Sequence, residues 1–141
     1  MQNTFIATSS IVINVPPEKV WEALTNPALV KQYLFGTDVK TDWQVGSPIT
    51  YSGEWEGKPY EDKGVITKNE PGKILETTYW SVAFGENIPE NNKNVRYELS
   101  PIEGGTTLTI TQDNNKTEAE RDHSQKNWDM VLGLMKKMLE A

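Results

Sequence analysis

The chain has 141 residues, a formal net charge of −6 and no cysteine. We expect one domain over residues 1–141 whose core needs no disulfide bonds, because a chain of this length buries most of its unfolded surface. The acidic balance argues against nucleic acid as a partner, since it repels phosphates. No apolar run is as long as a membrane span and we expect no signal peptide, so we predict a cytoplasmic location.

The first part of the chain predicts one strand and two short helices. β-branched residues are frequent and alternate within residues 4–15, which is typical of a strand. Prolines end that strand, and helical spacing of apolar residues follows over residues 16–27. A residue before proline avoids helical backbone, so this helix ends before Pro27, which can itself open a second short helix over residues 27–34.

From residue 37 the pattern changes to strands joined by turns. Consecutive strands with short connections pair in antiparallel fashion, so we expect an antiparallel sheet of about seven strands. A turn near Glu56-Gly57 predicts a hairpin, and residues 85–94 form a long loop that we expect to act as a lid. The predicted strands after the first are residues 37–43, 47–56, 57–70, 71–84, 94–101 and 104–113.

A long helix is predicted at the C-terminal end. Thr117 and Glu120 have the spacing of a capping box. Methionine-rich apolar residues lie on one broad side, which we expect Met130 and Leu134 to widen, and Gly133 suggests the close approach of a neighbour or a guest. A straight helix cannot fill the concave face of a twisted sheet, so either side chains or a ligand fill the remainder. The apolar side comprises Trp128, Val131, Leu132, Met135, Met138 and Leu139.

Several segments resemble the domain of the activator of heat-shock-protein-90 ATPase homologue family, within the START-like (SRPBCC) superfamily. They are PPEKVWEALTNPALVKQYL, TDWQVGSPITYSG, GKPYEDKGVITKNEPGKILETTYW, YELSPIEGGTTLTITQ and NWDMVLGLMKKMLE. The resemblance spans nearly the whole chain. It implies an α+β helix-grip fold, in which a curved antiparallel sheet of about seven strands grips the long C-terminal helix and leaves a cavity beneath it.

The resemblance also implies a range of functions. Superfamily relatives bind lipids, sterols, polyketides or plant hormones, and some act as cyclases or aromatases. The eukaryotic chaperone activators carry a separate domain ahead of this one. The resemblance here begins within the first dozen residues, so chaperone activation is not expected.

Aromatic residues on inner faces supply the candidate ligand site. Tyr51 and Trp55 share a strand face, Trp80 shares one with Ile74, and a concave pocket lined by such groups is the usual small-molecule site. The alternative is that these side chains only pack against each other. Arg121 either anchors a ligand carboxylate at the cavity mouth or forms a surface salt bridge. The predicted cavity residues are Tyr51, Trp55, Ile66, Trp80, Tyr97, Arg121, Trp128, Leu132 and Met135.

Catalytic and metal-binding motifs are absent from the sequence, so we expect no catalytic residue, metal or cofactor. His123 is the only histidine, and its polar surroundings favour a solvated residue over a general base. Adjacent strand residues point to opposite faces, so Glu61 and Asp62 cannot form an acid–base pair. We assign Glu54 and Glu56 to the solvent face.

The leading hypothesis is therefore non-enzymatic binding of a small hydrophobic or amphipathic ligand between the sheet and the C-terminal helix. One alternative is a cyclase- or hydrolase-type enzyme of the START-like superfamily. Another is a protein-interaction module related to chaperone ATPase activators. Both a monomer and a homodimer are compatible with the sequence.

Overall fold

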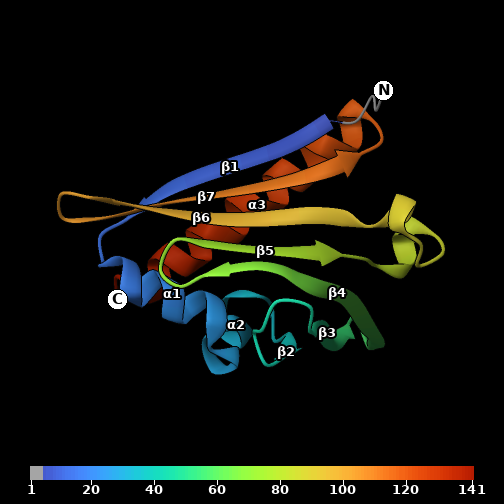
Figure 1. Cartoon of the computed structure of the whole chain (residues 1–141), viewed down its shortest axis with the longest axis horizontal. Coiled ribbons are helices and arrows are strands. Elements are labelled where there is room, and N and C mark those ends of the chain that lie inside the picture. Colours follow the sequence, from blue (N-terminus) through green and yellow to red (C-terminus); the bar gives the residue numbers. More distant parts are fainter. Residues whose placement is uncertain (1–4) are drawn as a thin grey trace.

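The computed structural model describes residues 5–141, apart from the side chain of Trp55. The order of elements is the predicted one: a strand, two helices, six further strands and a long helix (Figure 1). The elements are β1 (Phe5–Ile13), α1 (Pro17–Thr25), α2 (Pro27–Tyr33), β2 (Asp38–Lys40), β3 (Pro48–Trp55), β4 (Lys58–Glu70), β5 (Ile74–Tyr79), η1 (Val82–Phe84), η2 (Pro89–Asn91), β6 (Lys93–Ile102), β7 (Gly105–Asn115) and α3 (Glu118–Leu139).

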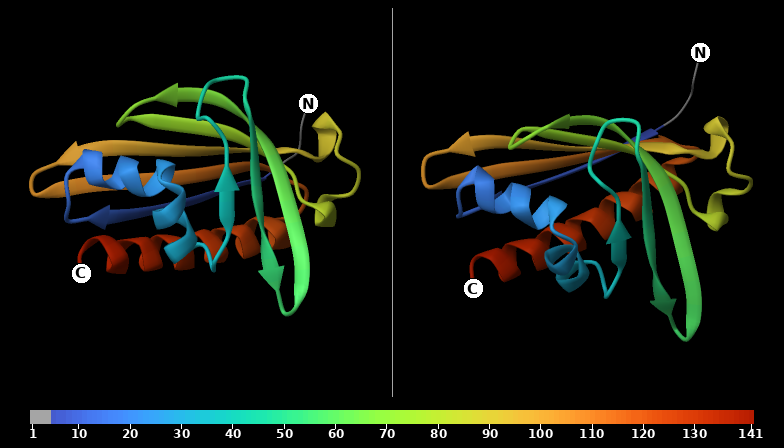
Figure 2. Two further views of the ribbon diagram at one scale, coloured as in Figure 1. Left: turned by 90° about the horizontal axis from the view of Figure 1, so that it is seen from below. Right: turned by 60° about the horizontal axis from the view of Figure 1, so that its bottom comes forward.

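The strands form one antiparallel seven-stranded sheet in the order β1-β7-β6-β5-β4-β3-β2. The first strand thus pairs with the last, and the three helices lie on the same side of the sheet (Figure 2). This arrangement confirms the predicted helix-grip fold. Glu56 and Gly57 have φ angles of +52° and +81°, the positive pair that a tight two-residue hairpin turn requires.

Two predicted strands are shorter than expected. The strand predicted over 71–84 ends at Tyr79, because the Ser81 hydroxyl accepts a hydrogen bond from the Ala83 backbone and starts the 3₁₀ helix η1. β2 ends at Lys40, since the Asp42 carboxylate accepts from the Gln44 backbone and turns the chain.

β4 bends sharply near its middle. Its C-terminal part pairs with β5 from Ile66 onward, whereas its N-terminal part, up to Val65, pairs with β3. At the changeover Gly64 approaches β5 so closely that a Cβ atom would lie 2.0 Å from the Thr78 carbonyl oxygen. Only glycine fits such an approach of two backbones. The bend carries β3 and β4 toward the side of the sheet on which α3 lies (Figure 2).

α3 begins at the predicted cap. The Thr117 hydroxyl accepts a hydrogen bond from the Glu120 backbone at 3.0 Å. The Glu120 carboxylate pairs with Lys93, a lysine that is only 4% exposed and also donates to the Asn114 carbonyl oxygen at 3.0 Å. The buried lysine therefore joins the start of β6, the end of β7 and the first turn of α3.

The buried face of α3 is narrower than predicted. Leu132 and Met135 lie in the main core together with Ile13, Leu108 and other apolar residues of the sheet. Met130 and Leu134 are 50% and 38% exposed, so the expected widening of the apolar side is wrong. The close approach of a neighbouring segment expected at Gly133 is also wrong, because a Cβ there would have no described atom within 4 Å other than those of the helix's own backbone and the adjacent residues. Among the helices within residues 5–141, none combines the length and hydrophobicity needed to cross a membrane.

Candidate ligand-binding cavity

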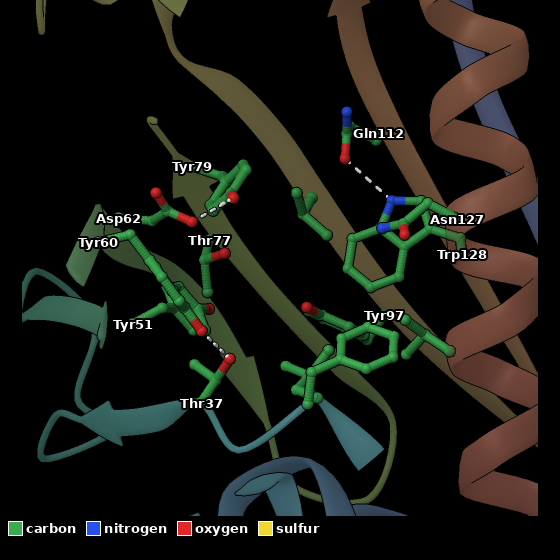
Figure 3. A pocket seen from close by; sticks show the side chains of 14 residues that line it. Thr37, Tyr51, Tyr60, Asp62, Thr77, Tyr79, Tyr97, Gln112, Asn127 and Trp128 are labelled. Carbon is green, nitrogen blue, oxygen red and sulfur yellow. Dashed lines mark hydrogen bonds between the residues drawn. The ribbon is translucent and has the colours of Figure 1, made fainter. Parts of the chain in front are cut away.

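A cavity of about 340 Å³ lies between the middle of α3 and the bent part of the sheet. Strands β3 to β7 contribute its walls, α3 closes one side, and the segment between α2 and β2 closes another (Figure 3). The lining residues are Leu34, Phe35, Thr37, Tyr51, Tyr60, Asp62, Thr77, Tyr79, Val95, Tyr97, Gln112, Asn127, Trp128 and Val131.

Four tyrosines dominate the sheet side of the cavity. They come from four neighbouring strands, and alternation along each strand directs them to the concave face. Tyr51 and Tyr79 meet edge to face with ring centroids 5.9 Å apart, and Tyr97 meets Trp128 of α3 in the same way at 6.0 Å. These contacts fix the rings of the wall, because edge-to-face pairs are a preferred aromatic geometry.

Hydrogen bonds hold most of the polar groups of the wall. The Tyr79 hydroxyl donates to the Asp62 carboxylate at 2.6 Å, and the hydroxyls of Thr37 and Tyr60 share a bond of 2.6 Å (Figure 3). Across the cavity, the indole N–H of Trp128 donates to the Gln112 side chain at 2.9 Å. The wall is therefore rigid and preorganised, which lowers the entropic cost of binding.

Tyr51, Tyr79 and Tyr97 are neutral at physiological pH, because the pKa of each is raised. Burial raises the pKa of Tyr51 to about 12. Burial also raises the pKa of Tyr79, with a further contribution from its hydrogen bond to Asp62, and it raises the pKa of Tyr97 well above the usual value. A neutral phenol both donates and accepts hydrogen bonds, so these residues can recognise a polar group on an otherwise apolar molecule.

Among the described residues, no group of three or more His, Asp or Glu side chains is placed to hold a metal ion. Asp62 is the one acid among the lining residues, and none of them is Lys, Arg or His. The chemistry of the cavity thus rests on aromatic surface, hydroxyls, amides and a single carboxylate.

The family model for the Activator of Hsp90 ATPase homolog 1-like protein matches residues 14–140. The chain belongs to this family. A search of curated proteins gave no match. Among solved structures, that of ChR145 from Cytophaga hutchinsonii is 46% identical, covers 99% of this chain and 97% of its own, and has a TM-score of 0.87.

More distant structures share the fold of this chain. The Aha1 dimer from Colwellia psychrerythraea is 24% identical over 96% of both chains, with a TM-score of 0.76. CalU16 from Micromonospora echinospora is 20% identical over 98% of this chain and 87% of its own, with a TM-score of 0.73.

Three of the nine residues predicted for the cavity of this family member line it: Tyr51, Tyr97 and Trp128. The side chain of Trp55 lies outside the described part of the chain. The other five are placed elsewhere. Ile66, Leu132 and Met135 are 0%, 1% and 0% exposed and belong to the main core rather than to the lining.

Trp80 and Arg121 lie away from the cavity lining. The inward residues of β5 are Leu75, Thr77 and Tyr79, so Trp80 has the opposite parity, and its indole N–H donates to the Gly85 carbonyl oxygen at 3.1 Å. Arg121 forms ion pairs with Glu118 at 3.4 Å and Asp122 at 3.0 Å, which matches the salt-bridge alternative.

Sequence reasoning missed much of the polar wall. The missed residues follow the same alternation rule: Tyr60 and Asp62 are two apart on β4, as are Thr77 and Tyr79 on β5. This two-residue alternation was the sequence signal that could have identified these four residues as inward-facing. His123 is exposed. The loop 85–94 was expected to act as a lid, but it contributes no lining residue. Phe35, from the segment after α2, does line the cavity.

Proposed function

We propose that this protein binds a small amphipathic molecule with an aromatic or apolar body in the tyrosine-lined cavity. The supporting observation is the Tyr97 hydroxyl, which lines the cavity and has no hydrogen-bond partner among the described residues (Figure 3). A hydroxyl that faces the cavity without a protein partner is free to hydrogen-bond a ligand, and such a bond typically contributes about 0.5–1.5 kcal/mol.

The size of the cavity supports the same proposal. Small-molecule sites start at about 300 Å³, and an engineered apolar cavity of about 150 Å³ binds benzene. A volume of about 340 Å³ therefore suits a molecule of about two rings. The few polar groups at fixed positions would orient such a molecule, while the apolar side chains of Val95, Trp128 and Val131 would cover its body.

Binding is tested with a neutral two-ring naphthalene fluorophore that carries a carbonyl group. We expect saturable one-to-one binding with a blue-shifted emission. Val131→Phe fills the cavity from α3 and should abolish binding, whereas Val65→Phe makes the same change at a position that is 40% exposed and outside the lining, and should leave it intact. Absence of saturable binding by the wild-type protein would refute the proposal.

A milder variant guards against a folding defect in Val131→Phe. Tyr97→Phe removes only the unpartnered hydroxyl, and we expect it to weaken binding of the carbonyl probe about three- to tenfold, the value of one hydrogen bond. Equal binding by a folded Val131→Phe protein, as judged by circular dichroism, would count against the cavity as the binding site.

A second candidate function is proton transfer on a bound carbonyl compound. It is favoured by the short hydrogen bond between Tyr79 and Asp62 at the cavity wall, since a carboxylate can act as a general base beside a neutral phenol. The test is deuterium exchange at the α-carbon of a cyclic β-diketone in heavy water, followed by NMR. The proposal is supported if wild-type protein exchanges the proton faster than the uncatalysed background and Asp62→Asn does not. It is refuted if wild-type protein exchanges the proton no faster than Asp62→Asn. Stimulation of a chaperone ATPase would rest on the family description alone, and we do not propose it.

A further inference from the structure

We propose that the cavity selects cations, namely small aromatic or apolar molecules that carry one protonated amine, and that Asp62 is the counter-ion. This inference rests on the proposed binding function and specifies the chemical class of the ligand. It follows from the charge of the lining, from the surroundings of Asp62 and from the aromatic rings beside it.

Asp62 brings an unneutralised charge to the cavity wall. Its Oδ2 atom accepts a hydrogen bond from Tyr79, but no Lys or Arg among the described residues forms an ion pair with it. The next residue, Lys63, lies on the opposite face of β4, where it pairs with Glu61 at 3.7 Å. A half-buried carboxylate without a cation is unfavourable, so a ligand that supplies the cation is stabilised there.

The rings around Asp62 favour the same kind of ligand. Tyr51 and Tyr79 meet edge to face beside the carboxylate, and Tyr60 is two residues from it on the same face of β4 (Figure 3). Aromatic faces attract ammonium groups through their negative π-surface, and more strongly where water is excluded. A carboxylate flanked by tyrosines thus combines the two recognition elements for a protonated amine.

Anionic ligands are disfavoured by the same wall. The 14 lining residues include no Lys, Arg or His. Arg121, for which anchoring a ligand carboxylate was one of two alternatives, pairs with Glu118 and Asp122. The net charge of −6 adds a field of the same sign. A carboxylate or phosphate entering the cavity would meet a like charge without compensation.

Three probes of one shape test the inference: naphthyl-ethylamine, naphthyl-ethanol and naphthyl-acetate, titrated by isothermal calorimetry at pH 7. We expect the amine to bind about tenfold more tightly than the alcohol, the value of one charge-assisted hydrogen bond, and the acetate to bind most weakly. This comparison uses the wild-type protein only, so it is decisive even if a variant folds poorly.

Two variants then locate the charge. Asp62→Asn keeps an acceptor for Tyr79 and should make the affinities of that variant for the amine and the alcohol about equal, so that the amine preference disappears. Glu61→Gln removes the same charge from the outer face of the same strand and should preserve the amine preference.

The outcomes separate the two proposals. Alcohol binding without an amine preference, or an equal loss of amine affinity in Glu61→Gln and Asp62→Asn, overturns the inference and leaves the proposed function standing. Failure of all three probes to bind overturns both.

Discussion

The two halves of the sheet carry different kinds of side chain on the concave face. Where β1 and β7 lie against α3, the inward residues are closely packed and mostly apolar, and Ile13, Leu108 and Ile110 are 0% exposed. Where β3 and β4 bend toward the α3 side of the sheet, the cavity-lining residues of β4 and of neighbouring β5 include large side chains with polar tips, as Tyr60 and Tyr79 show. A straight helix follows only part of a curved sheet, so the rest needs rigid, amphipathic side chains that surround a space.

The largest effect on stability is expected in the half of the sheet that α3 covers. Leu132→Ala removes a side chain that is 1% exposed from the packed core. We expect the free energy of unfolding to fall by about 3 kcal/mol, because the cavity that it leaves cannot collapse fully. Urea denaturation measures the change, and a loss below about 1 kcal/mol would show that this half is loosely packed as well.

The bend between the halves is tested by Gly64→Ala. The added methyl would lie 2.0 Å from a backbone oxygen of β5, so the two strands must move apart, and we expect a loss of about 2 kcal/mol. Gly53→Ala is the matched control, because its methyl would meet only the end of the Tyr60 side chain at 2.8 Å. Similar losses in both variants would argue against a special role for the bend.

Alkaline pH should affect the cavity half through its tyrosines. The pKa of Tyr51 is raised to about 12 in the folded protein from 10 in the unfolded chain, so between pH 10 and 12 the unfolded state loses the proton first. Stability present below pH 10 is therefore lost as the pH rises, by about 1.4 kcal/mol per pH unit for each such group. Urea denaturation at pH 11 should show a smaller loss for Tyr51→Phe than for wild type, and an equal loss would contradict the assignment.

Tyr97→Phe should have the smallest effect on stability. The variant removes a hydroxyl without a protein partner, so we expect the unfolding free energy at pH 7 to stay within about 0.5 kcal/mol of wild type. Thermal denaturation followed by circular dichroism measures it. A loss above about 1 kcal/mol would mean that the hydroxyl stabilises the fold rather than serving the cavity.

The fold was accessible from the sequence because its signals are local. Pro27 marks the boundary of two helices, Glu56-Gly57 forms the predicted turn, and Thr117 caps the last helix where expected. Family resemblance then supplied the arrangement of these elements, which local signals do not contain.

The lining of the cavity was harder to predict from the sequence, because which residues line it depends on which alternate residues of each strand face inward. In β5 the first two residues, Ile74 and Leu75, are both apolar, so the sequence does not reveal which set faces inward, and Trp80 was placed on the wrong side relative to Tyr79. The exposure of Met130 depends on where α3 crosses the sheet, which is a tertiary property. The roles of Tyr51, Tyr97 and Trp128 in binding stay predictions until a ligand is measured.

The changeover in β4 has a consequence for local unfolding. β2, β3 and the first part of β4 hydrogen-bond to one another. Within the described residues, the backbone pairing of β4 before Ile66 with the β5 side of the sheet is one bridge, between Lys63 and Trp80, the residue after β5. This wing can detach from the packed half by breaking few backbone bonds. Amide hydrogens of β3 should therefore exchange with deuterium far faster than those of β7, through openings that also admit a guest molecule to the interior.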